Sequence, residues 1–163
     1  MALSEVHAFT ASYDKLVLRL LSAAKVMFNG KQIDVTAQWD TGASCTAISH
    51  EVVKALQLIP QGKRTIKTPS STKEVNTYLV DIVLPNNVRV HNVDVCDSDI
   101  GEQGIGMLIG MNIISLGDFA VSNYENKTNY SFRIPSQKAV DYRAAATIAN
   151  NIAMSHGKPK KRK

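Results

Sequence analysis

One short segment constrains the fold of this chain more than any other. Asp40-Thr41-Gly42-Ala43-Ser44 directly follows Gln32–Trp39, a stretch with the pattern of a buried strand. A carboxylate at the end of a buried strand is costly unless it has hydrogen-bond partners or a proton. Gly42 lets the backbone turn back tightly, and the Thr41 hydroxyl can hold neighbouring backbone groups. We therefore predict a fixed loop that presents the Asp40 carboxylate at a strand end, where catalytic groups are often found.

The residues around this segment predict a chain that is mainly β. Asn29-Gly30 favours a tight hairpin turn, because both residues tolerate positive φ. A short helix is expected after Ser49, whose side chain can cap it, and should run to Leu56. Alanine and isoleucine at helical spacing predict a second helix within Gln137–Met154. The predicted strands are Leu16–Leu20, Lys25–Phe28, Gln32–Trp39, Arg64–Thr68, Glu74–Leu84, Val88–Val95, Met107–Ile109, Phe119–Ser122 and Asn129–Ile134.

A second motif lies far along the chain, where the apolar run Met107-Leu108-Ile109 ends at Gly110. Glycine at a strand end indicates that another backbone passes closely. With this motif the sequence resembles the retroviral-type, or retropepsin-like, aspartic proteases. Their pattern is an apolar strand, Asp-Thr/Ser-Gly-Ala/Ser, a flap hairpin, and an apolar-apolar-Gly motif that closes a loop beside the aspartate. The similarity covers Leu16 to Ile134.

The chain also departs from the family pattern. Pro69 and hydroxyl residues stand at the expected flap tip, where the family usually has glycines. Gln38 occupies a position, two residues before the aspartate, that is usually apolar. The retroviral enzymes are shorter and have no counterpart of the C-terminal helix. A helix after Asp-Thr-Gly is more typical of bacterial and cellular members, so the resemblance is to a member of that type.

The resemblance implies a fold class and a site. The fold is mainly all-β: a single closed β-barrel or sandwich protomer with one or two short helices, acting as a two-fold homodimer. Asp40 is the catalytic residue, and Thr41 and Gly42 support the active-site loop. No metal or cofactor is implied. The residues implied in substrate binding are Ala43, Ser44, Thr68, Pro69, Ser70, Ser71, Ile109 and Gly110, with the flap at 68–72.

One motif per chain supplies only half of the chemistry. Aspartic proteases need two carboxylates that share one proton. Asp118 lacks the Thr/Ser-Gly continuation, and Asp81 lies among alternating polar positions. We therefore expect a homodimer in which Asp40 pairs with its copy. The expected function is that of an aspartic endopeptidase, which hydrolyses a peptide or protein substrate with an activated water and works best on the acid side of neutrality.

Two other functions compete with this one. The first is a non-catalytic module of the same fold, which would bind an extended peptide and dimerise without cleaving it. The second makes the basic C-terminus primary, with the fold as a dimerising platform for an anionic partner. The net charge of +5 is confined to the last six residues, because the other 14 basic residues balance the 14 acidic ones. A nucleic-acid surface is normally a broad basic face, so the sequence argues against a nucleic-acid partner.

The remaining features suggest an ordinary globular chain. Its two cysteines are too few for a disulfide scaffold or a zinc site, and we expect Cys45 to be a small buried apolar residue. No apolar stretch is long enough for a membrane span and no signal peptide is visible, which predicts a cytoplasmic location. We expect an N-terminal extension at 1–14, a protease domain at 15–135, a C-terminal helix at 136–156 and a basic tail at 157–163.

Overall fold

The first hairpin of the structure forms where Asn29-Gly30 predicts it. The structure, a computed structural model, describes residues 5–68 and 71–156. Strands β2 (Leu20–Phe28) and β3 (Lys31–Trp39) pair in antiparallel fashion, and Phe28 lies opposite Lys31. Asn29 and Gly30 have φ values of 47° and 76°, as a type I′ turn requires. The predicted hairpin is therefore confirmed.

Six strands close into a barrel in the order β2-β3-β8-β4-β7-β6, and β6 pairs back onto β2. The further members are β4 (Thr46–Ser49), β6 (Ser71–Val83), β7 (Arg89–Ser98) and β8 (Met107–Ile109). Strands β3 and β8 run parallel, and so do β4 and β7. The expectation of a mainly β, closed-barrel protomer with few short helices is confirmed.

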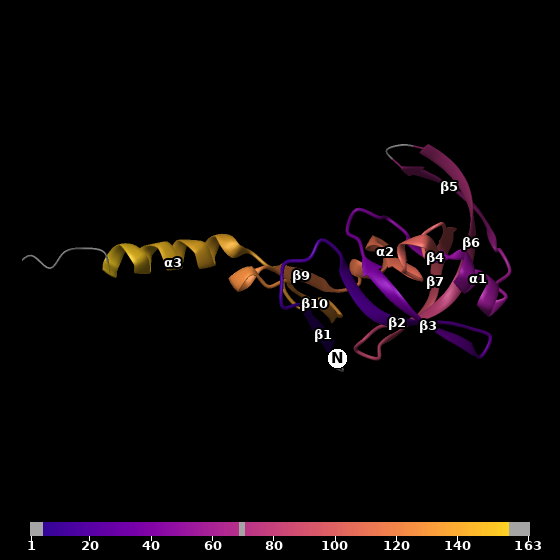
Figure 1. Cartoon of the computed structure of the whole chain (residues 1–163). Helices are drawn as coiled ribbons and strands as arrows, with labels where there is room; N and C mark the ends of the chain where they lie inside the picture. Colours follow the sequence, from indigo (N-terminus) through magenta and orange to yellow (C-terminus); the bar gives the residue numbers. More distant parts are fainter. Residues whose placement is uncertain (1–4, 69–70, 157–163) are drawn as a thin grey trace, which may run out of the picture.

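A long hairpin projects from one side of this barrel (Figure 1). It consists of β5 (Gly62–Thr68) and the first half of β6, and its last pair joins Thr68 to Ser71. The hairpin predicted from the sequence is therefore present. Pro69 and Ser70, assigned to the flap, lie outside the described residues, as does the basic tail at 157–163.

A second, three-stranded sheet packs beside the barrel in the order β1-β10-β9. Its strands are β1 (His7–Ser12), β9 (Asp118–Ser122) and β10 (Asn129–Ile134). Phe9 of β1 and Phe132 of β10 contact Trp39 of the barrel, with ring centroids 5.6 and 5.0 Å away. Strand β1 lies within the segment assigned to an N-terminal extension, and the division of the chain into domains stays a prediction.

Three details of the predicted strands are wrong, and the first is that β1 was not predicted. Leu16–Leu20 is not a strand: β2 begins at Leu20, and Leu18 is fully exposed. Its alternating leucines mimic a strand, but they have no sheet neighbour to bury them. Strand β4 was not predicted, because all four of its residues are buried and it therefore shows no alternation of polar and apolar side chains.

Helix α1 (His50–Leu56) begins where the sequence predicts it. The Ser49 hydroxyl accepts a hydrogen bond from the amide of Val52, and Val52 and Leu56 are buried. A second short helix, α2 (Met111–Ile114), follows β8 and buries Ile113 and Ile114 in the core. Helix α2 directly follows Gly110 and contacts the Asp40 loop, where the Met111 amide donates to the Ala43 carbonyl.

The predicted C-terminal helix is present as α3 (Tyr142–His156). It extends away from the barrel (Figure 1). Its described side chains, through Met154, are exposed. Within the described part of the chain, no helix combines the length and apolar character needed to cross a bilayer.

Candidate active site

Parallel pairing of β3 with β8 brings the two sequence motifs together. Trp39 lies opposite Ile109, and the amide of the next residue, Asp40, donates a hydrogen bond to the Ile109 carbonyl at 3.0 Å. Asp40 and Gly110 therefore leave adjacent strands at the same end. The hydrogen bond from the Asp40 amide to β8 fixes the backbone of Asp40 and so holds its carboxylate at the strand end, as the sequence predicts.

The Asp40 loop turns back on its own carboxylate. The Gly42 amide donates to Oδ1 of Asp40 at 2.8 Å, and the Ala43 amide donates to the Asp40 carbonyl at 3.3 Å. A Cβ on Gly42 would lie 3.1 Å from the same Oδ1, so a side chain there would push the Asp40 carboxylate aside by a few tenths of an ångström. Thr41, Gly42 and Ser44 are exposed, whereas Asp40 is half-buried.

Another backbone passes close to Gly110, as its position at the end of a strand predicts. A Cβ on Gly110 would lie 2.6 Å from the backbone of Cys45 and 2.9 Å from the Ala43 carbonyl oxygen. The amide of Met111 donates to that Ala43 oxygen at 2.7 Å. The Asp40 loop and the α2 region are therefore packed backbone against backbone, and no larger residue fits at Gly110.

A polar network centred on the buried residue Thr46 supports this contact. Thr46 is fully buried; its hydroxyl accepts from the Gly110 amide at 3.1 Å and donates to Oδ1 of Asn112 at 2.7 Å. The Thr46 amide also donates to Oδ1 of Asn112, and Nδ2 of Asn112 donates to the Asp94 carbonyl. The network ties β4, β7 and α2 to one another beneath the loop. Neither Thr46 nor Asn112 stands in a distinctive sequence pattern, so this network was not predicted.

A pocket of about 670 Å³ opens at this loop. Its lining comes from the Asp40 loop, β4, β5, β7 and β8. Of the residues proposed for the site, Asp40, Gly42, Ala43 and Ser44 lie on its wall. Ile109 is fully buried and Gly110 packs on the loop backbone, so both lie behind the wall rather than on it. The complete lining is Asp40, Gly42, Ala43, Ser44, Cys45, Ala47, Arg64, Thr65, Ile66, Lys67, Cys96, Ser98 and Leu108.

An arginine from β5 spans this pocket. Nη1 of Arg64 donates to Sγ of Cys45 at 2.9 Å, and Nη2 forms an ion pair with the carboxylate of Asp94. The pKa of Cys45 is lowered to about 7, chiefly by a hydrogen bond from Cys96 and further by the positive charge of Arg64, against the opposing effects of burial and Asp94. The structure therefore corrects the interpretation of Cys45 as a small buried apolar residue. It is half-buried, charge-paired and on the pocket wall.

The other two aspartates weighed as partners for Asp40 are fully engaged elsewhere. Asp118 accepts hydrogen bonds from the Gln137 amide, the Ser136 hydroxyl and the Arg133 guanidinium, and these interactions hold its pKa well below the usual range. Asp81 likewise accepts from the Asn92 amide and from Arg89, which lowers its pKa. Neither carboxyl lines the pocket at Asp40, so neither can share a proton there.

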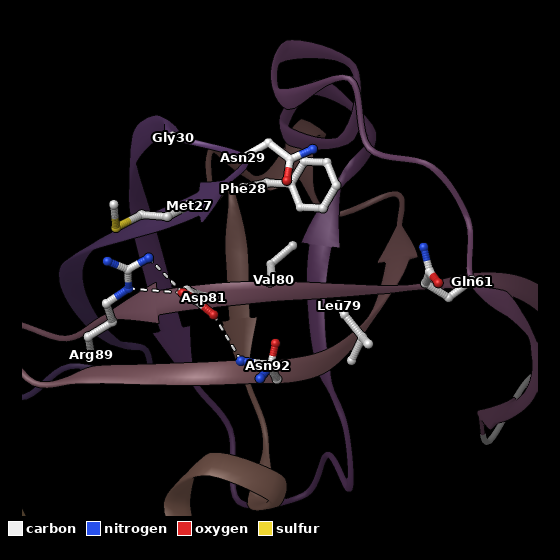
Figure 2. A pocket seen from close by; sticks show the side chains of 10 residues that line it. All are labelled: Met27, Phe28, Asn29, Gly30, Gln61, Leu79, Val80, Asp81, Arg89 and Asn92. Carbon is white, nitrogen blue, oxygen red and sulfur yellow. Dashed lines mark hydrogen bonds and ion pairs between the residues drawn. The ribbon is translucent and has the colours of Figure 1, made fainter.

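Asp81 belongs to a different hollow, of about 350 Å³, shown in Figure 2. This hollow includes the Asn29-Gly30 turn at the start of β3, whereas Asp40 follows the end of that strand. Nine strand residues separate the two ends by roughly 30 Å. Figure 2 shows the Asp81 carboxylate held between Arg89 and Asn92, at an irregular register of β6 on β7. Asp81 therefore stabilises the irregular pairing of β6 with β7.

Taken together, the closed barrel, the Asp-Thr-Gly loop and the glycine-ended parallel strand beside it define a retropepsin-like aspartic protease fold. The model of the family described as "gag-polyprotein putative aspartyl protease" matches residues 24–115, which is more than half of the chain and includes both motifs. This protein belongs to that family. The resemblance inferred from the sequence is therefore confirmed.

A solved structure agrees with the fold. A retropepsin-like aspartic protease from Rickettsia conorii is 15% identical, with a TM-score of 0.54, and the match covers 82% of this chain and 99% of that one. The simian foamy virus protease is 19% identical, with a TM-score of 0.43, over 59% of this chain and 92% of that one. At 15% identity, the likeness to the Rickettsia protein establishes the fold alone. No curated protein matches the chain significantly.

Proposed function

We propose that this protein is a homodimeric aspartic endopeptidase in which Asp40 and the Asp40 of a second copy share one proton. The observation that carries the proposal is that, of the described residues lining the pocket, Asp40 alone bears a carboxylate. A lone carboxylate supplies half of the acid–base pair that the chemistry needs. A two-fold axis near the exposed Thr41 and Gly42 would supply the other half.

In the proposed mechanism, a water molecule lies between the two Asp40 carboxyl groups. The ionised carboxylate accepts a proton from this water, and the protonated one donates a proton to the oxygen of the scissile carbonyl. As it loses this proton, the water attacks the carbonyl carbon to give a tetrahedral intermediate. The carboxyl group that took the water's proton then passes it to the nitrogen, the other carboxylate takes a proton from a hydroxyl of the intermediate, and the C–N bond breaks. The Gly42 amide, which donates to Oδ1 of Asp40 at 2.8 Å, fixes the direction of that oxygen.

The substrate that fits this site is an extended peptide. The β5–β6 hairpin extends beside the pocket, and a peptide could add to such a hairpin through main-chain hydrogen bonds. We propose that the end of this hairpin, at 68–72, acts as the flap, and that Ala43 and Ser44 contact the peptide from the opposite side. Ala47, Ile66 and Leu108 give the pocket an apolar wall, which would favour an apolar substrate side chain.

The test is proteolysis of an unfolded polypeptide by wild type and by Asp40→Asn, over a range of pH values. Asp34→Asn is the matched control, because Asp34 is an exposed aspartate on β3, the strand that leads to Asp40, and its carboxylate lies 3.5 Å from Nζ of Lys25. We expect Asp40→Asn to reduce cleavage to background while its melting temperature stays close to that of wild type, and Asp34→Asn to remain active. Sedimentation of the wild type should detect a dimer.

Two results would overturn the proposal. Undiminished cleavage by Asp40→Asn would eliminate the mechanism. A wild-type protein that binds extended peptides without cleaving them at any pH would instead favour the non-catalytic module of the same fold.

A further inference from the structure

Two cysteines that are distant in the sequence meet on one wall of the pocket. Cys45 follows the Asp40 loop directly, and Cys96 lies in β7, opposite Ala47 of β4. Sγ of Cys45 lies 3.3 Å from the Thr46 carbonyl oxygen, and Sγ of Cys96 lies 3.7 Å from the same atom. Both side chains line the pocket that contains Asp40. The two sulfurs are therefore neighbours, and molecules that enter the pocket can reach the wall they form.

The two thiols differ in exposure and in charge. Cys45 is half-buried, whereas Cys96 is only 1% exposed. The groups that act on Cys45 are Cys96 and Asp94 of β7 and Arg64 of β5, and their combined effect brings its pKa to about 7. The pKa of Cys96 is raised, first by its hydrogen bond to Cys45 and then by burial. The lowered pKa of Cys45 favours its thiolate, while the raised pKa of Cys96 keeps that thiol protonated.

This arrangement has the parts of a redox-active pair. An accessible thiolate with a cationic neighbour is the form of cysteine that reacts with oxidants. A second thiol beside it can resolve the first oxidation product. We propose that Cys45 is an oxidation site for hydroperoxides, and that Cys96 resolves the oxidised residue by forming a Cys45–Cys96 disulfide.

The chemistry balances in two steps. The Cys45 thiolate attacks one oxygen of the hydroperoxide, the O–O bond breaks, and the leaving oxygen takes up a proton to give water or an alcohol. Cys45 is thereby oxidised to a sulfenic acid while the peroxide is reduced. Sulfur of Cys96 then attacks Sγ of Cys45, the S–O bond breaks, and the departing hydroxide leaves as water with the Cys96 proton. A small thiol reverses the modification by exchange.

Oxidation would also affect the site beside it. The backbone of Cys45 packs against Gly110, and its thiolate is the partner of Nη1 of Arg64. Drawing Cys45 toward Cys96 removes the partner of Arg64 and shifts the wall next to the Asp40 loop. We expect a reversible loss of peptide cleavage. This consequence rests on the proposed function, whereas the oxidation itself does not.

The direct test is mass spectrometry of the full-length protein after treatment with hydrogen peroxide. Wild type should lose two hydrogens and yield a linked Cys45–Cys96 peptide, which a thiol reductant separates. In Cys96→Ser, dimedone should trap a sulfenic acid on Cys45. In Cys45→Ser, Cys96 should stay reduced. An unmodified Cys45 in folded wild type, or equal oxidation of Cys96 in Cys45→Ser, would overturn the proposal.

A second measurement tests the role of Arg64 without any enzyme assay. The rate of Cys45 alkylation by iodoacetamide should rise with pH through a midpoint near 7 in wild type. Arg64→Gln should move that midpoint upward and slow alkylation at pH 7 several-fold. Lys63→Gln is the matched control, because the neighbouring Lys63 pairs with Glu74 rather than with Cys45. An unchanged midpoint in Arg64→Gln would contradict the assigned role.

The effect on cleavage is measured last, as the activity of each protein before and after peroxide. Wild type should lose activity after peroxide and regain it with reductant. Cys45→Ser should have the same activity before and after peroxide. If no protein cleaves peptide at all, the proposed function fails, while the mass spectra still decide the oxidation site. If the disulfide forms but peroxide leaves cleavage unchanged, the proposed effect of Cys45 oxidation on cleavage is wrong.

Discussion

Trp39 stacks on Phe119, with ring centroids 5.5 Å apart and ring planes 6° apart. Trp39 is the last residue of β3 and precedes Asp40, whereas Phe119 belongs to the separate three-stranded sheet. Nε1 of Trp39 also donates to the Ser22 hydroxyl at 3.0 Å. The residue before the proposed catalytic aspartate is thus fixed by both sheets, which makes the second sheet part of the support of the site.

Phe119→Ala tests this support. We expect a loss of about 2 kcal/mol in the free energy of unfolding, less than for a fully buried phenylalanine because Phe119 is half-buried. Val121→Ala, at an exposed position on the same strand, should cost much less. Urea denaturation of both variants measures the difference. Equal costs would show that the stack contributes nothing beyond ordinary surface packing.

Thr46→Val addresses the network beneath the loop. Valine keeps the shape of threonine but removes the hydroxyl that pairs with the Gly110 amide and with Asn112. Leaving the buried Gly110 amide unpaired should lower the free energy of unfolding by about 2 kcal/mol. Thr36→Val, at an exposed position on β3, should change it little. Denaturation midpoints that move equally for the two variants would rule out a structural role for the network.

Asp118→Asn should show a pH-dependent loss of stability. The folded-state pKa of Asp118 is depressed by the Gln137 amide, Ser136 and Arg133. Its contribution is therefore fully present above the ordinary aspartate pKa, near 4, and is lost as the pH falls through the depressed value. Asp118→Asn should be clearly less stable than wild type at pH 7, and the difference should narrow in strong acid. A difference that stays constant from pH 7 to pH 3, or grows as the pH falls, would contradict this assignment.

Truncation separates the residues that anchor Asp118 from the helix beyond them. A chain that ends at Lys138 keeps the Ser136 hydroxyl and the Gln137 amide, both of which donate to Asp118. A chain that ends at Pro135 loses both. We expect the chain that ends at Lys138 to have a melting temperature close to that of the full-length protein. The chain that ends at Pro135 should melt several degrees lower. Equal melting temperatures for the two would mean that these bonds carry no stability.

Local sequence signals predicted the parts of the fold that local chemistry determines. Asn29-Gly30 located the first hairpin, and Ser49 located the start of α1, because a turn or a cap depends on a few adjacent residues. Strand β4 was missed because a strand buried on both faces has no period to read. Leu16–Leu20 was misassigned because alternation alone does not supply a pairing partner.

The candidate site divides in the same way. Asp40, Gly42 and Gly110 lie in recognisable motifs, and the structure joins them by parallel pairing of β3 and β8. Arg64 and Asp94 come from strands that the sequence gives no reason to place beside Cys45. Their approach depends on closure of the barrel, so the altered pKa of Cys45 could not be predicted from its neighbours in the sequence.

The central claim, that two Asp40 carboxylates act together, is tested most directly by mixing subunits. Wild type and Asp40→Asn are unfolded together, refolded at constant total protein, and assayed for cleavage as the mutant fraction increases. If each site needs both carboxylates, random pairing makes activity fall as the square of the wild-type fraction, to about one quarter in an equal mixture. Activity that falls only in proportion to the wild-type fraction, to about one half, would contradict the shared site.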